Sequence, residues 1–489
     1  MRHKTCAAHV VALIVISVCV PATPTLAQGG EGMVPIDPAV LAALETKGEA
    51  TFWVLFREQA DLSPAFAIRD WDDRGRFVSE RLVATAEASQ ARVRALLVAS
   101  GAELRPFWIA NVIEVKTANR ALPHLLAAHP EVAEIVAPPE VEPIVIFPGV
   151  EQPPTESIGW NLGHIRANLV WSIYGVTGEG AVVGSIDSGV EYDHPALVEQ
   201  YRGNLGGGVF DHNYNWFDPA LLCGNPSIEP CDTDGHGTAT TSIAVGDDGG
   251  DNQIGVAPGA RFIMAASDWT PARVLAAMQW MMAPTDLNGQ NPRPDLRPQV
   301  VNNSWGWTTP STYFLAAVQA WLASGIFPVF AVGNEGPGCG TERIPAGYLE
   351  AYAVGAHDSN DFIASFSSRG PSPFGGTKPD IVAPGVDIRM AFPGGSYVTF
   401  SATSFSTPHV TGTVALMVSL NPELVGKPET VRLHLDHSAI DRSDLTCGGD
   451  PGDNNVWGEG RLDAFDAASF LLIDGFESGD TSAWSAAVP

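Results

Sequence analysis

The chain has 489 residues, more than a typical single domain, so its length indicates two or more folded units. Its formal net charge at pH 7 is -28, from 27 Lys and Arg against 55 Asp and Glu. Such a surface repels phosphate groups, which argues against nucleic-acid binding and against docking to anionic membranes.

The first 27 residues have the pattern of a secretory signal peptide. Arg2 and Lys4 precede an apolar run over residues 7–20, and residues 25–27 offer a small-residue cleavage site. The run is too short for a membrane-spanning helix, and no later apolar stretch reaches about 18 residues. We therefore expect a secreted protein, extracellular or periplasmic, without a membrane anchor.

Residues 28–136 predict a small α+β domain. Hydrophobic periodicity predicts six elements in the order βαββαβ, at residues 51–56, 73–100, 102–108, 112–117, 118–129 and 132–136. This order is that of a ferredoxin-like domain. The proline-rich residues 137–157 that follow predict an extended and accessible linker.

From residue 158 to about residue 470 the pattern changes to strands that alternate with helical segments. The clearest strands are predicted at residues 181–186, 261–265, 300–303, 327–332 and 351–354. This alternation predicts an α/β fold with a mainly parallel sheet covered by helices on both faces. Functional side chains in such folds lie at the carboxyl ends of the strands.

Three polar residues stand in short motifs that suit nucleophilic catalysis. Asp187 follows the strand at residues 181–186, where its carboxylate can hold a histidine in one tautomer. His236, between two glycines, can take and return a proton near neutral pH. Ser404 precedes an apolar helix whose N-terminal N–H groups can stabilise an oxyanion. Each residue alone is more often a turn or cap residue, but together they favour catalysis.

The motifs at residues 186–189, 234–238 and 403–408, in this order, resemble those of the subtilase (subtilisin-like) family. The resemblance spans about residues 150–470. It implies a serine endopeptidase that hydrolyses polypeptides through an acyl-enzyme, with Asp187, His236 and Ser404 as its triad and no cofactor required for the chemistry. It also implies that Asn334, at the end of a predicted strand, donates to the oxyanion.

Two other functions are alternatives to this one. A subtilase-like protein that only binds peptides is the main alternative. An α/β-hydrolase esterase would need a Gly-x-Ser-x-Gly motif and the order Ser, Asp, His, and the chain has neither.

The resemblance further implies a substrate-binding edge that pairs with extended peptide backbone. Its expected members are Ser304, Trp305, Gly306 and Gly333. Residues 345–347 resemble the wall of the first specificity pocket. Arg343 would then lie near the pocket floor and favour an acidic substrate side chain, but a solvent-exposed arginine is the preferred interpretation.

The nucleophile motif at residues 402–406 departs from the usual subtilase pattern, Gly-Thr-Ser-Met-Ala, at three positions, of which two bear on the serine. Ala402 stands where the family has glycine, and Phe405 stands where it has methionine. Neither change deletes a catalytic group, although both could tilt the serine. His409 matches the family, where it packs within the helix and does not react.

The same resemblance assigns the domains. Residues 28–136 would be an inhibitory propeptide, residues 137–157 a processing linker and residues 158–470 the catalytic domain of a self-processed, monomeric zymogen. An unrelated ferredoxin-like domain is the alternative for residues 28–136. Residues 471–489 form a small, polar tail for which we have no mechanism.

Four cysteines remain after the signal peptide, namely Cys223, Cys231, Cys339 and Cys447. An even number in an exported chain predicts two disulfides, and of three pairings we favour Cys223 with Cys231 because they share one loop. The acidic loops at residues 246–252 and 450–455 could hold structural calcium, but they lack EF-hand spacing and turn formation is the better interpretation.

Overall fold

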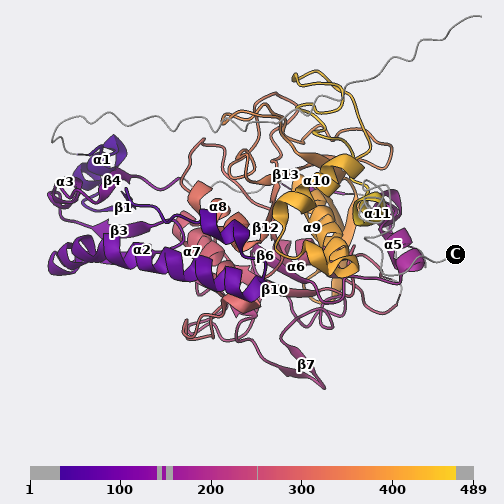
Figure 1. Ribbon diagram of the computed structural model, residues 1–489, viewed down its shortest axis with the longest axis horizontal. Coiled ribbons are helices and arrows are strands. Elements are labelled where there is room, and N and C mark those ends of the chain that lie inside the picture. The colour runs from indigo at the N-terminus through magenta and orange to yellow at the C-terminus, as the bar shows by residue number, and fades with distance from the viewer. Residues whose placement is uncertain (1–33, 140–145, 150–157, 251, 470–489) are drawn as a thin grey trace, which may run out of the picture.

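The computed structural model describes residues 34–139, 146–149, 158–250 and 252–469 (Figure 1). The predicted signal peptide, most of the predicted linker and the predicted tail lie outside these residues. Within the described part of the chain, no helix is both long enough and apolar enough to cross a bilayer.

The N-terminal domain is an antiparallel sheet with helices packed on one face (Figure 1). Its elements are α1 (Pro38–Thr46), β1 (Ala50–Phe56), η1 (Ser63–Ala67), α2 (Trp71–Ala99), β2 (Glu103–Phe107), β3 (Val112–Thr117), α3 (Leu122–Ala127) and β4 (Val132–Val136). The strand order β2-β3-β1-β4 gives the predicted ferredoxin-like arrangement. The sequence analysis missed α1, whose N-terminus is capped by the Asp37 carboxylate, which accepts from the Ala39 N–H at 2.8 Å.

The second domain is built on a seven-stranded parallel sheet within the described residues, in the order β14-β13-β12-β11-β6-β10-β9. The strands are β6 (Val182–Asp187), β9 (Trp216–Phe217), β10 (Arg261–Ala266), β11 (Val300–Asn303), β12 (Phe327–Ala331), β13 (Tyr352–His357) and β14 (Ile381–Pro384). All pair in parallel, so the predicted α/β sheet is confirmed.

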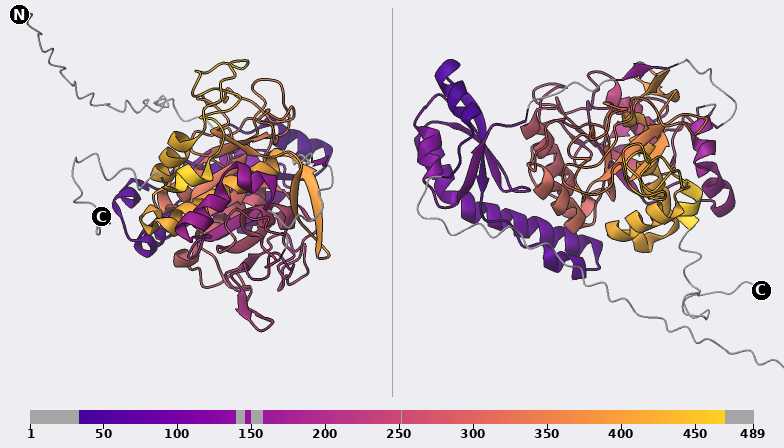
Figure 2. Two further views of the ribbon diagram at one scale, coloured as in Figure 1. Left: turned by 90° about the vertical axis from the view of Figure 1, so that its right-hand side faces the viewer. Right: turned by 90° about the horizontal axis from the view of Figure 1, so that it is seen from above.

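Helices cover both faces of this sheet (Figure 2). On one face lie α5 (Ala167–Tyr174), α6 (His236–Val245), α9 (Thr403–Leu420) and α11 (Ala464–Ser469), and on the other lie α7 (Pro271–Met282) and α8 (Leu315–Ser324). Adjacent strand residues point to opposite faces, so Val300 joins the first core and Val301 the second. Because both faces are buried, most residues of the strands are apolar, as in β12 (FPVFA).

Several shorter elements complete the domain. They are α4 (Trp160–His164), β7 (Asn204–Gly206), β8 (Val209–Phe210), η2 (Pro294–Leu296), η3 (Pro422–Leu424) and α10 (Pro428–Ser438). Cys223 is bonded to Cys231 and Cys339 to Cys447, which is the favoured pairing.

The face of the N-terminal sheet that α1 and α3 leave uncovered packs against α7 and α8 (Figure 2). Trp53 of β1 contacts Tyr313 and Phe314 edge to face, with ring centroids 6.0 and 5.9 Å apart. The Gln279 side chain of α7 accepts from the backbone N–H of Trp108 at 2.8 Å. The two domains therefore share one apolar core.

A small antiparallel sheet lies beside the start of α9. It contains β15 (Ile388–Phe392), β16 (Ser396–Ser401) and β5 (Phe147–Pro148), the last of which comes from the predicted linker. Phe147 pairs with Ser401, and the Gly149 N–H donates to the Thr399 carbonyl at 3.0 Å. The linker thus passes close to the predicted nucleophile, Ser404.

Candidate active site

The ends of three elements bring the predicted catalytic residues to one edge of the sheet. Asp187 is the last residue of β6, His236 is the first of α6, and Ser404 is the second of α9. Gly235, which precedes His236, has φ of 90°, and a Cβ there would lie 2.4 Å from the Phe392 ring. Glycine is therefore required at that position.

Asp187 and His236 form a buried pair. The His236 Nδ1–H donates to Asp187 Oδ1 at 2.7 Å. The same oxygen accepts from the Ser188 N–H at 2.8 Å, and Oδ2 accepts from the Thr240 hydroxyl at 2.9 Å. Because its carboxylate is held on both oxygens, Asp187 fixes the orientation and the tautomer of the imidazole.

The second ring nitrogen of His236, Nε2, is not bonded to Asp187, and the imidazole lies close to the start of α9. Nε2 is buried and has no hydrogen-bond partner among the described residues. The ring of Phe405, the residue after Ser404, lies 5.8 Å from the imidazole. The Ser404 hydroxyl instead donates to the Ser304 carbonyl at 3.3 Å. The nucleophile and the base are thus neighbours, and a rotation of the Ser404 side chain is needed for the hydrogen bond between them.

The surroundings of His236 favour its protonated form. Burial opposes a charged imidazolium, but the Asp187 carboxylate, helped by Asp234 and Asp232, outweighs it and raises the pKa of His236 above 6.5. His236 is therefore a stronger base than a free histidine.

Asn334 lies beside the nucleophile with a fixed amide orientation. Its Oδ1 accepts from the backbone N–H of Thr403 at 2.9 Å and from the Thr403 hydroxyl at 2.8 Å. Its donors are the Nδ2 hydrogens, which lie on the opposite side of the amide. Asn334 lines a pocket together with Ser404, whose own N–H lies in the first turn of α9.

The expected substrate-binding residues line the same pocket, which adjoins Ser404. Its lining residues are Ser304, Trp305, Gly306, Ala331, Gly333, Asn334, Arg343, Thr403 and Ser404. The Trp305 ring itself is buried and packs against Phe330 with ring centroids 5.4 Å apart. Arg343 is only 8% exposed, so the preferred expectation of a solvent-exposed arginine is wrong.

A larger apolar cavity of about 390 Å³ lies on the other side of His236. It is lined by Ile146, Asp234, His236, Ala239, Trp269, Phe392, Phe400 and Phe405. The sequence analysis missed Trp269, Phe392 and Phe400 because they stand in separate loops and strands that carry no motif. Ile146 belongs to the predicted linker, which therefore reaches the cavity beside His236.

The departures at Ala402 and Phe405 fit the site. Ala402 has φ of -174°, an extended conformation that any residue adopts, so glycine is not needed there. Phe405 is buried against Phe400 in a small apolar cluster. His409 donates to the Phe405 carbonyl at 2.9 Å and accepts from Asn161 at 2.8 Å, and burial lowers its pKa to about 3. His409 is therefore a neutral packing residue.

The described residues contain one group with the geometry of a metal site, namely His164, His357 and Asp361, whose ligand atoms all lie within 4.8 Å of one another. His164 Nε2 lies 2.7 Å from Asp361, and guanidinium nitrogens of Arg442 and Arg461 lie 2.5 and 3.5 Å from the same carboxylate. Two guanidinium groups would repel a cation at this distance. The group fits an ion-pair network better than a metal centre.

The first acidic loop uses its oxygens to form a turn. Asp248 Oδ1 accepts from the N–H groups of Gly250 and Asn252 at 2.9 and 3.2 Å, and Oδ2 accepts from the Asn252 amide and the Tyr397 hydroxyl at 2.7 and 2.9 Å. The second loop is closed by the Asp450 N–H, which donates to the Asp453 carbonyl at 2.7 Å. These hydrogen bonds favour turn formation over calcium binding at both loops.

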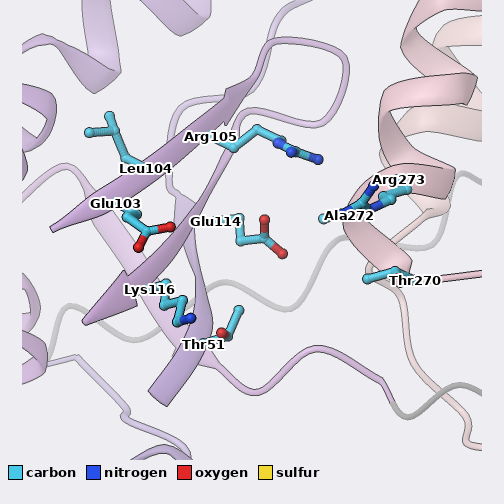
Figure 3. A pocket seen from close by; sticks show the side chains of 9 residues that line it. All are labelled: Thr51, Glu103, Leu104, Arg105, Glu114, Lys116, Thr270, Ala272 and Arg273. Carbon is cyan, nitrogen blue, oxygen red and sulfur yellow. The ribbon is translucent and has the colours of Figure 1, made fainter. Parts of the chain in front are cut away.

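A further cavity of about 360 Å³ lies between the two domains and contains none of the predicted catalytic residues (Figure 3). It is lined by Thr51, Glu103, Leu104, Arg105, Glu114, Lys116, Thr270, Ala272 and Arg273. Charged side chains of β2 and β3 face the first turn of α7 across it. The seam between the domains is therefore apolar in one part and polar in another.

Comparison with known proteins agrees with this site. Residues 178–460 match the Subtilase family. Bacillopeptidase F of Bacillus subtilis (strain 168) is 41% identical over 335 residues, which cover 66% of this chain and 22% of that protein. Subtilisin Savinase of Lederbergia lenta is 30% identical over 314 residues, which cover 63% of this chain and 98% of the relative. The chain thus spans about a fifth of the first relative and nearly all of the second.

Proposed function

Because this chain belongs to the subtilase family of serine proteases, we propose that it is an endopeptidase that uses Asp187, His236 and Ser404 to hydrolyse peptide bonds. The observation that carries the proposal is the Asp187–His236 hydrogen bond of 2.7 Å. It commits Nδ1 to the carboxylate and leaves Nε2 as the proton acceptor on the side of Ser404.

In the proposed reaction, Ser404 Oγ attacks the scissile carbonyl carbon while its proton moves to His236 Nε2. The resulting imidazolium is stabilised by Asp187, and the oxyanion accepts from the Asn334 amide and the Ser404 N–H. His236 then gives its proton to the leaving amine as the C–N bond breaks, which forms an acyl-enzyme. Water, activated by the same histidine, hydrolyses the ester and restores Ser404.

A fluorophosphonate probe tests this proposal, because it labels only a serine that a neighbouring base activates. We expect labelling of the full chain after self-processing, and loss of labelling in Ser404→Ala. Ser406→Ala is the matched control, since its buried hydroxyl only donates to the Thr403 carbonyl at 2.8 Å. Absence of labelling in the wild type, with the N-terminal domain removed, would favour the alternative of a peptide-binding protein without activity.

We also propose that the N-terminal domain is an intramolecular inhibitor and that the enzyme processes itself at the linker. Phe147 pairs with Ser401, only three residues before Ser404, and Ile146 lines the cavity beside His236. The described residues 146–149, which follow the N-terminal domain in the sequence, thus lie beside His236 and the start of α9. This arrangement supports a scissile bond on the N-terminal side of Ile146.

We also propose that the enzyme is exported and that it is a monomer. The signal-peptide pattern and the two disulfides are both typical of proteins that fold in an oxidising compartment. We therefore propose an extracellular or periplasmic enzyme that cleaves polypeptides. Subtilases need no cofactor for catalysis, and the proposed mechanism uses none.

A further inference from the structure

The pocket beside Ser404 is the place that receives a substrate side chain. When a scissile carbonyl carbon lies at Ser404 Oγ and its oxygen at Asn334, the side chain on the acyl side of that bond enters the pocket that these two residues line. We call the substrate residue that carries it the acyl-side residue. The pocket lies between the segments that follow β11 and β12, which are adjacent parallel strands.

Two glycines face each other across this pocket, and the Arg343 side chain lies between them. A Cβ on Gly306 would be 2.8 Å from Arg343 Cβ, and a Cβ on Gly333 would be 3.0 Å from Arg343 Cγ. The aliphatic stem of Arg343 thus contacts both walls. The remaining volume is about 10 Å³, which is close to the space that one water molecule needs.

The guanidinium group of Arg343 is held in place by its neighbours. Nε and Nη2 donate to Glu335 Oε1 at 3.0 and 2.6 Å, and Nη1 donates to the Gly306 carbonyl at 2.9 Å. Glu335 Oε2 in turn accepts from the backbone N–H of Asn334 at 2.8 Å. Glu335 therefore neutralises the positive charge of Arg343, and the hydrogen bonds of the guanidinium help to hold the aliphatic stem in place.

We propose that Arg343 determines the substrate specificity of the enzyme by filling this pocket, so that small acyl-side residues such as Gly, Ala and Ser are preferred. The inference rests on the proposed endopeptidase function. A large acyl-side residue has to displace the aliphatic stem of Arg343, whereas an acidic one finds a guanidinium already paired with Glu335. Steric exclusion by the stem, and not the charge, sets the preference.

Two substitutions separate volume from charge. Arg343→Ala removes the stem, and we expect the ratio of kcat/KM for Phe over Ala as the acyl-side residue to rise at least about tenfold. Arg343→Met keeps a stem of similar length without the charge, and we expect it to retain the wild-type preference. Arg293→Ala is the matched control, because Arg293 is half exposed and pairs with Asp295 away from the pocket.

The test is a peptide library that varies the acyl-side residue, cleaved by the self-processed full chain and each variant. A wild-type preference for Phe or Leu would overturn the inference, and so would an unchanged profile in Arg343→Ala. A preference for Glu that is lost in both variants would show that the charge acts instead. If Arg343→Ala does not fold, the wild-type and Arg343→Met profiles decide. Fluorophosphonate labelling, measured in parallel, reports separately on the proposed function.

Discussion

At the scale of single residues, the protonation state of His236 controls whether the site can react. The imidazole is almost fully buried, and its Nδ1 is committed to Asp187. Only the neutral ring offers a lone pair at Nε2 for the Ser404 proton. The Asp187 carboxylate, which orients the ring, therefore also makes the His236 imidazolium harder to deprotonate.

The pH dependence of activity follows from this balance. Because Asp187 raises the pKa of His236 above 6.5, the base is protonated, and activity is lost, as the pH falls through that raised pKa. We expect kcat/KM on a fluorogenic peptide to fall on the acid side with a midpoint above pH 6.5. A flat profile between pH 5 and 8, or a midpoint below 6.5, would contradict the role of His236.

Asn334 is expected to act in the transition state more than in substrate binding. We expect Asn334→Ala to lower kcat by about 10²- to 10³-fold, with little change in KM, because the amide bonds the oxygen only when it carries negative charge. Steady-state kinetics on a peptide amide measures this split. A variant that keeps more than about half of the wild-type kcat would show that Asn334 is not the oxyanion donor.

Sequence motifs could locate Asp187 and His236 because each sits at an element boundary flanked by glycine or serine. The motifs could not predict how the Arg343 side chain packs. Its stem lies between Gly306 and Gly333, and its charge is bound by Glu335. These contacts depend on the spacing of two neighbouring strands, which only the folded sheet determines.

At the scale of elements, one helix of the N-terminal domain completes a helix of the catalytic domain. Arg74 of α2 donates from Nε to the Ala323 carbonyl at 2.6 Å and from Nη2 to the Leu322 carbonyl at 2.9 Å, in the last turn of α8. Its Nη1 donates to the Gly426 carbonyl at 2.5 Å. The Leu322 carbonyl also accepts from the Gly325 N–H at 3.0 Å, so Arg74 of α2 adds side-chain donors to the C-terminal cap of α8.

Removal of this cap should weaken the inhibition by the N-terminal domain. We expect Arg74→Ala to raise the inhibition constant of the cleaved but still associated domain by roughly 10- to 100-fold, as expected for loss of charged hydrogen bonds. The constant can be measured from the activity recovered on dilution of the self-processed protein. Arg76→Ala is the control, since Arg76 is exposed on the same helix and its guanidinium pairs with Asp73 of that helix. Equal constants for the two variants would contradict the capping role.

Most helices and strands could be predicted from the sequence, and the errors in the remaining ones have simple physical causes. Long apolar strands such as β6 and β12 repeat a clear pattern and were found. The two-residue strands β5 and β9 are too short to show any periodicity. The helix predicted at residues 118–129 is reduced to α3, because the Asn119 side chain instead accepts from the Ala121 N–H in a turn.

At the scale of the whole molecule, the seam between the domains is close-packed in one part and contains a polar cavity in another. The apolar part holds Trp53 against Phe314, whereas the polar cavity places Glu114 and Arg273 across a gap (Figure 3). Burial raises the pKa of Glu114, so its charge is poorly solvated there. A seam of this kind can form during folding and still separate after the linker is cut, because only part of it is close-packed.

Under the proposed self-processing, that separation depends on the activity of the enzyme itself. We expect Ser404→Ala to yield a full-length protein with the N-terminal domain attached, because the proposed self-processing needs the Ser404 hydroxyl as its nucleophile. Mass spectrometry of the variant, purified from a host without other proteases, measures its N-terminus. Ser406→Ala, which keeps the nucleophile, should be processed as the wild type and begin at or before Ile146. A normally trimmed N-terminus in Ser404→Ala would show that another protease cuts the linker, and the proposal of self-processing would then fail while the fluorophosphonate test still decides the activity.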